Sequence, residues 1–252
     1  MSSDEKFAAY IEFKDVSKAF GDNRVLDHVS FSVMPGETIC ILGRSGVGKS
    51  VSLMNIMGFL KPDSGRVIVA HEDITDYGEE DLERIRKKVT IVFQNGALFD
   101  SLTVGENILF SLETREDYDE QNKEDVVRGL LHMVDLGDYE DVFPTDLSTG
   151  HKRAVAIARA LAAQPQCILY DEPTTMVDPI MGDHLIELML RLKNQLRLTA
   201  VVVTHDLDLM RRVADKVVVL FEGRAIYFGP VADLEKSEHP HIQEFLAMDR
   251  VA

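Results

Sequence analysis

The chain has no apolar run long enough to span a bilayer and nothing that resembles a targeting segment. Its longest strongly apolar stretches, such as residues 217–221, have the length of a β-strand, whereas a membrane helix needs about 20 residues. The opening MSSDEKFAAY is acidic and lacks the basic start and apolar core of a signal peptide, so we expect none. If the protein works at a membrane, we expect a partner protein to hold it there.

The low content of cysteine and of basic residues indicates which partners and which cellular compartment to expect. With 43 acidic residues against 27 lysines and arginines, the net charge is -16. We therefore expect no nucleic-acid partner and no direct docking on an anionic lipid surface. The two cysteines, Cys40 and Cys167, each lie in an apolar segment that predicts a buried strand. We interpret them as buried thiols rather than a disulfide or a reactive pair, which favours a reducing cytosol.

A phosphate-binding loop stands out in what the sequence does contain. Residues 43–50 read GRSGVGKS, the Gly-x4-Gly-Lys-Ser pattern, after an apolar run at 37–42 and before a helix-compatible stretch from Val51. In this context backbone N–H groups of the glycine turn face phosphate oxygens. Lys49 adds a charge for the β- and γ-phosphates, and the Ser50 hydroxyl ligates Mg²⁺. The pattern predicts a nucleoside triphosphate site rather than a solvated glycine turn.

Strand-like apolar runs alternate with helical stretches along the chain. The runs lie at residues 11–13, 29–33, 37–42, 67–70, 89–93, 167–170, 200–203 and 217–221. Near-continuous Val, Ile and Leu runs separated by helices predict a parallel sheet buried on both faces. The first two runs, with a turn at Gly21-Asp22-Asn23, predict an N-terminal antiparallel part that residues 67–70 join. The fold class is therefore α/β.

The middle of the chain predicts helices only. Thr103 and Glu106 form a capping-box pattern before an apolar stretch. A second apolar set recurs at helical spacing, namely Val126, Val127, Leu130, Leu131 and Val134. We interpret residues 96–151 as a helical subdomain inserted into a nucleotide-binding core at 8–95 and 152–236. The single domain at 8–236 is followed by a tail at 237–252 with a short helix.

Two further segments carry polar groups suited to phosphate chemistry. The apolar run at 167–170 ends in Asp171 and Glu172. In a phosphate-loop protein, the first acid can hold Mg²⁺ through water and the second can polarise the attacking water, although two such acids can also simply end a strand. Ser148 is the expected N-cap of a helix after Leu147, and the N–H groups of that first turn form an anion site. Two phosphate-binding helix starts in one chain suggest two nucleotides, or one nucleotide held by different subunits.

The order of these motifs resembles the nucleotide-binding subunit of an ABC transporter over about residues 10–235. The series is the phosphate loop, Gln94 after a strand, LSTGH, ILYDE, a segment ending in Asp178, and His205 after AVVVT. The resemblance implies a P-loop ATPase with a RecA-like core that uses ATP and Mg²⁺. It also implies a homodimer, paired head to tail, in which each ATP lies between one phosphate loop and the other subunit's signature helix.

The resemblance implies a role for individual residues. Catalytic positions are Glu172 as general base, His205 on the γ-phosphate and Gln94 as a link to the membrane subunit. The positions that match Mg²⁺ contacts are Ser50, Gln94 and Asp171. The positions that match nucleotide contacts are Phe20, Val25, Gly43, Arg44, Ser45, Gly46, Val47, Gly48, Lys49, Ser50, Val51, Ser148, Thr149, Gly150, His151 and Asp178. Taken singly, Phe20 also fits core packing and His205 a helix cap or a core position.

The signature segment departs from the family pattern at two positions. The usual Leu-Ser-Gly-Gly-Gln is Leu-Ser-Thr149-Gly-His151 here. Threonine lacks the freedom of glycine at positive φ, but a helix start needs no such conformation. Because Glu172 and His205 are both present, we expect an active ATPase rather than a degenerate one.

The stretch after Gln94 indicates which transporter is involved. Gln94-Asn-Gly-Ala-Leu-Phe99, and Asp178-Pro-Ile180 further on, resemble the Mla/Mce-type phospholipid-transport ATPases of bacteria. That resemblance implies peripheral attachment to the cytoplasmic face of the inner membrane, an integral permease, an Mce-type substrate-binding protein and, in some systems, a small cytosolic regulator. It also implies phospholipid transport that maintains lipid asymmetry. Leu98 and Phe99 fit core packing equally well.

Other interpretations remain open at the level of sequence. An ATPase for lipoprotein release or small-solute import would use the same motifs with different partners. A soluble ABC ATPase acting on DNA or the ribosome is disfavoured by the acidic charge and by the lack of a coiled-coil insertion or a tandem domain. A kinase or GTPase is disfavoured by the signature helix and by the absence of an Asn-Lys-x-Asp motif.

Overall fold

The computed structural model describes residues 8–115 and 119–248. The expectation of no signal peptide concerns a start that lies mostly outside these residues, as do parts of the polar run at 117–125 and of the tail. Within the described residues, no helix combines the length and the apolar character needed to cross a membrane.

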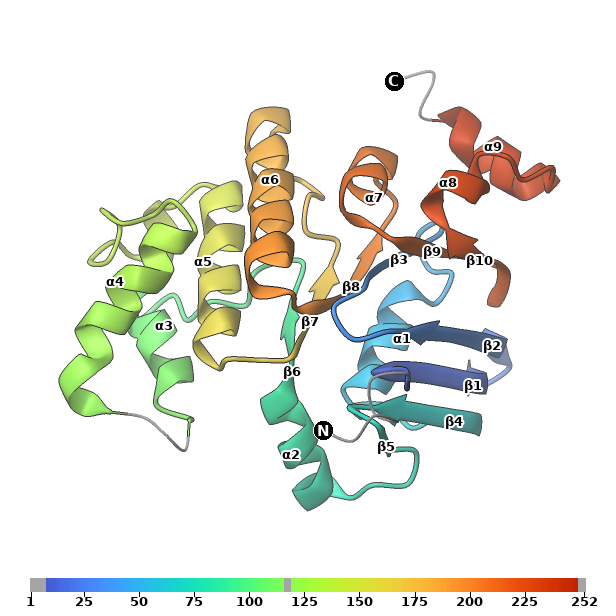
Figure 1. Cartoon of the computed structure of the whole chain (residues 1–252), viewed down its shortest axis with the longest axis horizontal. Helices are drawn as coiled ribbons and strands as arrows, with labels where there is room; N and C mark the ends of the chain where they lie inside the picture. The colour runs from blue at the N-terminus through green and yellow to red at the C-terminus, as the bar shows by residue number, and fades with distance from the viewer. Residues whose placement is uncertain (1–7, 116–118, 249–252) are drawn as a thin grey trace.

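The described residues form two β-sheets, one of four strands and one of six (Figure 1). The antiparallel sheet has the order β2-β1-β4-β5, built from β1 (Ile11–Phe20), β2 (Asn23–Val33), β4 (Ser64–Val69) and β5 (Glu72–Asp73). The second sheet has the order β10-β9-β3-β8-β7-β6, built from β3 (Thr38–Leu42), β6 (Val89–Val92), β7 (Cys167–Asp171), β8 (Thr199–Thr204), β9 (Lys216–Phe221) and β10 (Arg224–Pro230). Its strands are parallel except β10, which pairs antiparallel with β9.

Helices cover the larger sheet and extend away from it. They are α1 (Lys49–Ile56), α2 (Glu79–Lys88), α3 (Val104–Leu112), α4 (Lys123–Met133), α5 (Thr149–Ala162), α6 (Pro179–Leu196), α7 (Leu207–Val213), α8 (Val231–Leu234) and α9 (Pro240–Met248), with 3-10 turns at Glu120–Asn122 and Pro144–Asp146. In Figure 1, α3, α4 and α5 lie on the side opposite the antiparallel sheet. The described residues between β6 and β7 form no strand, as the sequence predicts.

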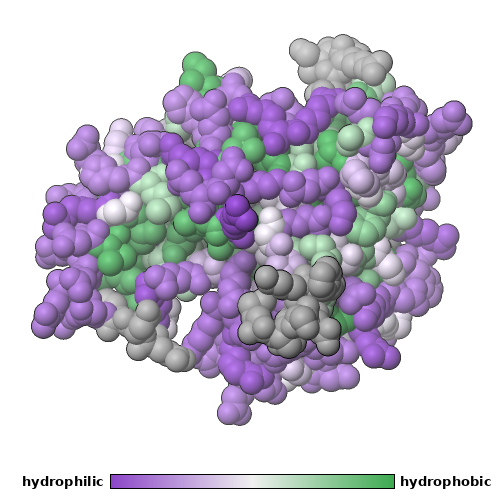
Figure 2. All heavy atoms as spheres, viewed as in Figure 1, coloured by the Kyte–Doolittle hydropathy of each residue, from purple (hydrophilic) through white to green (hydrophobic). Residues whose placement is uncertain are grey.

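Alternating side chains of β3 explain why this sheet is buried on both faces. Ile39 and Ile41 belong to one hydrophobic core, which also contains the antiparallel sheet and α1. Cys40 and Leu42 belong to a second core, formed with α3 to α7. All four side chains are fully buried, which accounts for the unbroken apolar run in the sequence. On the face shown in Figure 2, by contrast, most residues are hydrophilic, and hydrophobic residues show mainly between the helices on the α4 side.

The α/β class, the parallel sheet and the antiparallel part are confirmed. Cys40 and Cys167 are buried and unbonded, as expected. Thr103 caps α3 in a complete capping box, and a short helix, α9, follows residue 237. The prediction of a strand at residues 11–13 was too short, because pairing with β2 extends β1 to Phe20. The strand β10 was not predicted, since its burial is only partial.

Candidate nucleotide site

Neighbouring parallel strands bring the predicted site residues to one edge of the sheet. The order β3-β8-β7-β6 places four strand ends side by side. The phosphate loop follows β3, His205 follows β8, Asp171 ends β7 with Glu172 next, and Gln94 lies just beyond β6. The carboxyl edge of a parallel sheet is where α/β proteins commonly bind ligands, because loops and helix starts converge there. Residues separated by more than 150 positions thereby share one location.

The phosphate loop has the backbone that anion binding requires. Gly48, at φ 108°, is the N-cap of α1 and makes no side-chain cap, so the helix start is not closed by a side chain. A side chain at Gly48 would also meet the Val25 carbonyl oxygen at 2.6 Å. Gly46, at φ 79°, has open space where a Cβ would stand. The N-terminal N–H groups of α1 are thus left without a side-chain cap, which fits the binding of a phosphate group.

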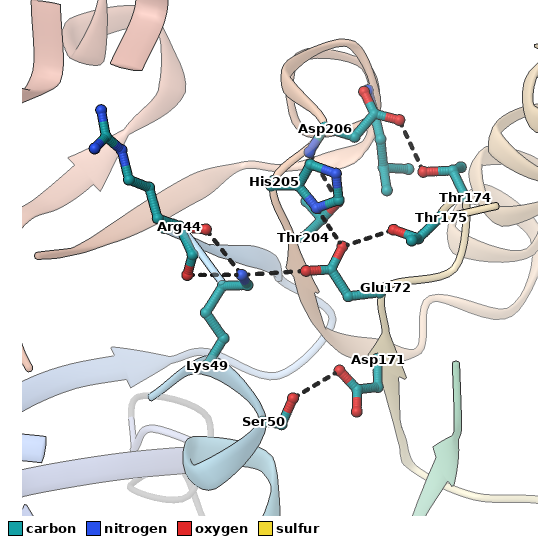
Figure 3. Close-up of polar contacts among 12 residues, drawn as sticks. Arg44, Lys49, Ser50, Asp171, Glu172, Thr174, Thr175, Thr204, His205 and Asp206 are labelled. Atoms are coloured by element: carbon teal, nitrogen blue, oxygen red, sulfur yellow. Dashed lines mark hydrogen bonds and ion pairs between the residues drawn. The ribbon is translucent and has the colours of Figure 1, made fainter. Parts of the chain in front are cut away.

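Lys49 and Ser50, the predicted phosphate and Mg²⁺ contacts, lie at the start of α1 (Figure 3). The Lys49 ammonium donates to the Gly43 carbonyl at 2.8 Å and to the Arg44 carbonyl at 3.2 Å, so it is held at the loop. The Ser50 hydroxyl donates to Asp171 Oδ1 at 3.1 Å, joining α1 to the end of β7. A hydroxyl and a carboxylate side by side are oxygen donors of the kind that Mg²⁺ prefers. The donor set therefore fits the predicted metal.

Glu172 lies at the centre of this group and is nearly buried. Its Oε1 is 3.2 Å from Lys49 Nζ, and its Oε2 is 2.9 Å from His205 Nδ1. The Thr175 hydroxyl also donates to Oε2, at 3.0 Å. Figure 3 shows these side chains converging on the carboxylate from three segments. Glu172 has φ 49°, a conformation that is uncommon outside glycine and that occurs more often at functional positions.

Burial raises the pKa of Asp171. The Ser50 hydrogen bond and the charges of Lys49 and Arg153 oppose this effect, and the nearby Glu172 reinforces it. Desolvation therefore outweighs the favourable contacts that the protein itself supplies. A cation bound at this carboxylate would offset that cost.

Gln94 and Asp171 line an open depression of about 540 Å³. Asn95, Arg153 and Thr149 also face it. The depression links the end of β6 to the end of β7 and to the beginning of α5. Arg153 is almost wholly buried, and its Nε has no hydrogen-bond partner among the described residues.

The signature segment begins α5 as predicted. Ser148 is the N-cap, and its hydroxyl accepts a hydrogen bond from the His151 N–H at 3.2 Å. Thr149 is the first helical residue and is not among the positive-φ residues, so the departure from glycine causes no backbone strain. A Cβ at Gly150 would lie 2.8 Å from the Met181 side chain, so the helices α5 and α6 pack closely here. Within the described residues, no hydrogen bond or ion pair connects this segment to the phosphate loop.

Asp178, Phe20 and Val25 are predicted residues that lie outside the loop and the strand ends described above. Asp178 caps α6 by accepting from the Met181 N–H at 3.0 Å. Phe20 ends β1 and is half exposed, with Lys18 Nζ 5.8 Å from its ring centroid. The core-packing interpretation of Phe20 is therefore not supported. Val25 contacts the phosphate loop through its backbone near Gly48.

Residues that sequence reasoning did not single out also shape the site. Thr175 contacts Glu172, and the Thr174 hydroxyl donates to Asp206 at 2.8 Å. Arg159 of α5 donates to the carbonyls of Ala97 at 2.7 Å and Gly96 at 3.0 Å. The two hydroxyls are close to the acidic pair in sequence, which is a weak signal. The Arg159 contacts depend wholly on the fold.

Comparisons with known proteins agree with this geometry. The sequence pattern of the family described as ABC transporter matches residues 26–175. The chain is 35% identical over 241 residues to the probable ribonucleotide transport ATP-binding protein mkl of Mycobacterium leprae (strain TN), which covers 96% of this chain and 70% of the relative. It is 35% identical over 243 residues to the methionine import ATP-binding protein MetN of Corynebacterium glutamicum, which covers 94% and 67% respectively.

Solved structures lead to the same family. The ATP-binding cassette MJ0796, a dimer in a post-hydrolysis state bound to ADP and Pi, aligns with a TM-score of 0.80 and 31% identity over 88% of this chain and 98% of that one. The protein cbiO1 from Clostridium perfringens, part of an ABC transporter complex, aligns with a TM-score of 0.83 and 28% identity. This alignment covers 96% of this chain and 97% of cbiO1. With the phosphate loop, the acidic pair and the signature helix in place, the chain belongs to the ABC transporter family, as an ATP-binding and ATP-hydrolysing subunit of a bacterial transporter.

Proposed function

We propose that the chain hydrolyses ATP as a head-to-tail homodimer and thereby powers phospholipid transport through a separate permease at the cytoplasmic face of the inner membrane. The observation that carries the catalytic part is the convergence of Lys49, Ser50, Asp171, Glu172 and His205 at the carboxyl edge of the sheet. ABC ATPase subunits pair with each other and work with a membrane permease, so the proposal adds the arrangement of the pair and the cargo to the family's general activity.

The proposed binding roles follow from where each group is held. Lys49 meets the β- and γ-phosphates as a fixed charge, since the loop carbonyls already orient its ammonium. Ser50, Asp171 and Gln94 are the residues that would hold Mg²⁺, whose charge stabilises the phosphate oxygens when it is bound. Phe20 offers an exposed aromatic face to the adenine, and Val25 lies beside the loop where the ribose would follow.

Glu172 is the proposed general base. Its carboxylate accepts the proton of the attacking water, and its near burial limits competition from bulk solvent. His205 lies 2.9 Å from Glu172 with a largely exposed ring, so one ring nitrogen can contact the carboxylate while the other faces outward to the γ-phosphate. Gln94 borders the same depression as Asp171. In this proposal it relays the state of the nucleotide site toward the permease.

The second subunit is proposed to supply the signature segment. Ser148, Thr149 and Gly150 form a helix start that can bind phosphate but makes no bond to its own phosphate loop within the described residues. Two large apolar side chains flank Asp178 and are strongly exposed, Met176 at 84% and Ile180 at 72%. In the part of the chain that the structure describes, the phosphate loop has no second helix start of its own chain bonded to it, and exposed apolar residues lie beside Asp178. Both features support pairing of two copies here.

The cargo proposal rests on the segment after Gln94. Phe99 and Phe110 are 43% and 51% exposed, and their rings meet edge to face at 4.9 Å. An exposed aromatic pair suits docking of a permease helix, because such a helix would bury the apolar area of the pair. A chain this acidic is repelled by an anionic membrane surface, so we expect a protein partner to hold it there. The Gly-Ala-Leu-Phe sequence of this segment resembles the corresponding segment of Mla/Mce-type ATPases, and this resemblance supports the lipid cargo. An Mce-type substrate-binding protein and a small regulator would complete such a system.

Import of a small solute is the second candidate. It is supported by the names of the relatives from Mycobacterium leprae and Corynebacterium glutamicum, which refer to ribonucleotide transport and methionine import. The nucleotide site does not distinguish between the cargoes, because ATP and cargo bind in different polypeptides.

The test is to purify the native membrane complex through a tag on this chain. Its ATPase activity is then measured with phospholipid vesicles, with ribonucleotide and with methionine. We expect stimulation by phospholipid and co-purification of an Mce-type protein. We also expect Phe99→Asp to release the chain from the permease while ATP binding persists, and Phe228→Asp, an equally exposed aromatic on β10, to do neither. Stimulation by a soluble solute alone would refute the lipid cargo and leave the ATPase proposal intact.

A further inference from the structure

Thr175 bonds the proposed general base, Glu172, but is not one of the residues proposed to bind phosphate. Its hydroxyl donates to Glu172 Oε2 at 3.0 Å, and its backbone N–H donates to the Glu172 carbonyl at 3.3 Å. Pro173 occupies the second position of the turn so formed, where its fixed φ is favourable. The turn brings the hydroxyl back over the carboxylate (Figure 3).

The other two side chains that contact this carboxylate are also proposed to contact phosphate. Lys49 approaches Oε1 at 3.2 Å, and His205 approaches Oε2 at 2.9 Å. Under the proposed function, both Lys49 and His205 also contact phosphate. Each of them must therefore divide its hydrogen bonds between the substrate and Glu172. Within the described residues, the Thr175 hydroxyl is bonded to Glu172 alone, so its contact can persist throughout turnover (Figure 3).

The carboxylate needs such a fixed partner. The terminal torsion of a glutamate is broad and roughly twofold, so the backbone alone does not fix the direction of its lone pairs. A general base must lie within hydrogen-bond reach of the proton that it removes. The turn that carries Thr175 is itself anchored, because Thr174 donates to Asp206 Oδ2 at 2.8 Å while Asp206 Oδ1 caps α7. The hydroxyl is thus held from a second segment.

We propose that Thr175 is a positioning residue, whose hydroxyl orients the Glu172 carboxylate toward the attacking water. This inference rests on the proposed role of Glu172 as general base. It predicts that loss of the hydroxyl lowers the rate of the chemical step without weakening ATP binding, since within the described residues Thr175 makes no hydrogen bond to the phosphate loop or to the proposed Mg²⁺ ligands.

The test compares Thr175→Val, which removes the hydroxyl at nearly constant shape, with Thr175→Ser, which keeps it. Both are measured in the tagged membrane complex. We expect Thr175→Val to lower kcat about tenfold or more with an unchanged KM for ATP, and Thr175→Ser to stay within about threefold of the wild type. Thr199→Val is the matched control, because it removes a buried hydroxyl that accepts from the Gly36 N–H far from the site. It should leave kcat unchanged.

A third variant separates this inference from the proposal on which it rests. In a Glu172→Gln background, Thr175→Val should cause no further loss of turnover, because both changes act through one carboxylate. If Glu172→Gln hydrolyses ATP normally, the general-base assignment fails first. If Glu172→Gln is inactive but Thr175→Val retains full kcat, or if Thr175→Ser is as slow as Thr175→Val, Thr175 does not position the base.

Discussion

Replacing Glu172 by glutamine tests the catalytic proposal with the least change in shape. The side chain keeps its length and can still accept from Thr175, but it loses its charge and its basicity. In the structure the carboxylate faces Lys49 Nζ at 3.2 Å, and both side chains are about nine-tenths buried. The substitution therefore removes the proposed general base and, at the same time, the anionic partner of a buried lysine.

These two losses have different magnitudes and different observables. General-base catalysis commonly contributes about 10²–10⁴-fold, so turnover should fall by at least two orders of magnitude. Removing one partner of a buried ion pair can cost about 3–5 kcal/mol, but Lys49 retains two carbonyl acceptors. We therefore expect a smaller loss of about 1–2 kcal/mol in the free energy of unfolding. For a domain of this size, that lowers Tm by roughly 2–8 °C.

Phosphate release and thermal melting measure the two effects separately. ATP added without Mg²⁺ should bind the variant and reduce the Tm deficit, because phosphate oxygens then replace the lost carboxylate beside Lys49. Glu187→Gln is the control, since that carboxylate is exposed on α6 and should affect neither readout. Turnover within threefold of the wild type would refute the general-base assignment. An unchanged Tm without nucleotide would refute the energetic role given to the ion pair.

Other substitutions probe the surrounding groups. Lys49→Ala should abolish ATP binding in a calorimetric titration while the far-ultraviolet circular dichroism spectrum stays that of the wild type. Thr149→Gly should change Tm little and keep or raise ATPase activity, since Thr149 is unstrained at its helix start; loss of hydrolysis would reveal a role for the hydroxyl. Asp171→Asn should abolish Mg²⁺-dependent ATP binding yet raise Tm at neutral pH. Because the pKa of Asp171 is raised in the folded state, the protonated form of this side chain stabilises the wild type in acid, and this stabilisation is lost as pH rises through the folded-state pKa. The higher Tm of Asp171→Asn should therefore approach that of the wild type on acidification. Arg159→Lys should keep basal ATPase activity but reduce stimulation by the permease, because lysine lacks the planar fork with which two separate nitrogens of arginine reach the Gly96 and Ala97 carbonyls; unchanged stimulation would contradict this link.

The sequence was a reliable guide wherever a motif carries its own local geometry. The phosphate loop predicts a strand, a glycine turn and a helix start, and β3 and α1 lie on either side of it. The capping box at Thr103 and the N-cap at Ser148 are likewise local, and both form. Apolar runs predicted the parallel strands because burial on both faces leaves no room for polar alternation. The limits of the core and of the helical subdomain remain predictions.

Contacts between segments could not be predicted in this way. Arg159 is one of several basic residues on a helix, and nothing in its local sequence indicates that it reaches carbonyls 62 and 63 positions earlier. The exposure of Phe99 was also undetermined, since an aromatic after a strand fits a core as well as a surface. Strand β10 was missed because its side chains are mostly half-exposed and its pairing with β9 follows a tight turn at Gly223.

Under the proposed function, one chain is an incomplete enzyme. A single copy brings together the charge of Lys49, the proposed Mg²⁺ ligands and the proposed general base, all near the ends of adjacent strands. The second proposed phosphate-binding helix start, at Ser148, belongs to α5, which packs against α3, α4 and α6 and makes no hydrogen bond to the phosphate loop within the described residues. Closing a site around the γ-phosphate would require that helix start to come from another copy. Arg159 connects the same α5 helix to the segment after Gln94, so closure of the dimer and the presentation of Phe99 to a permease would depend on the movement of one helix.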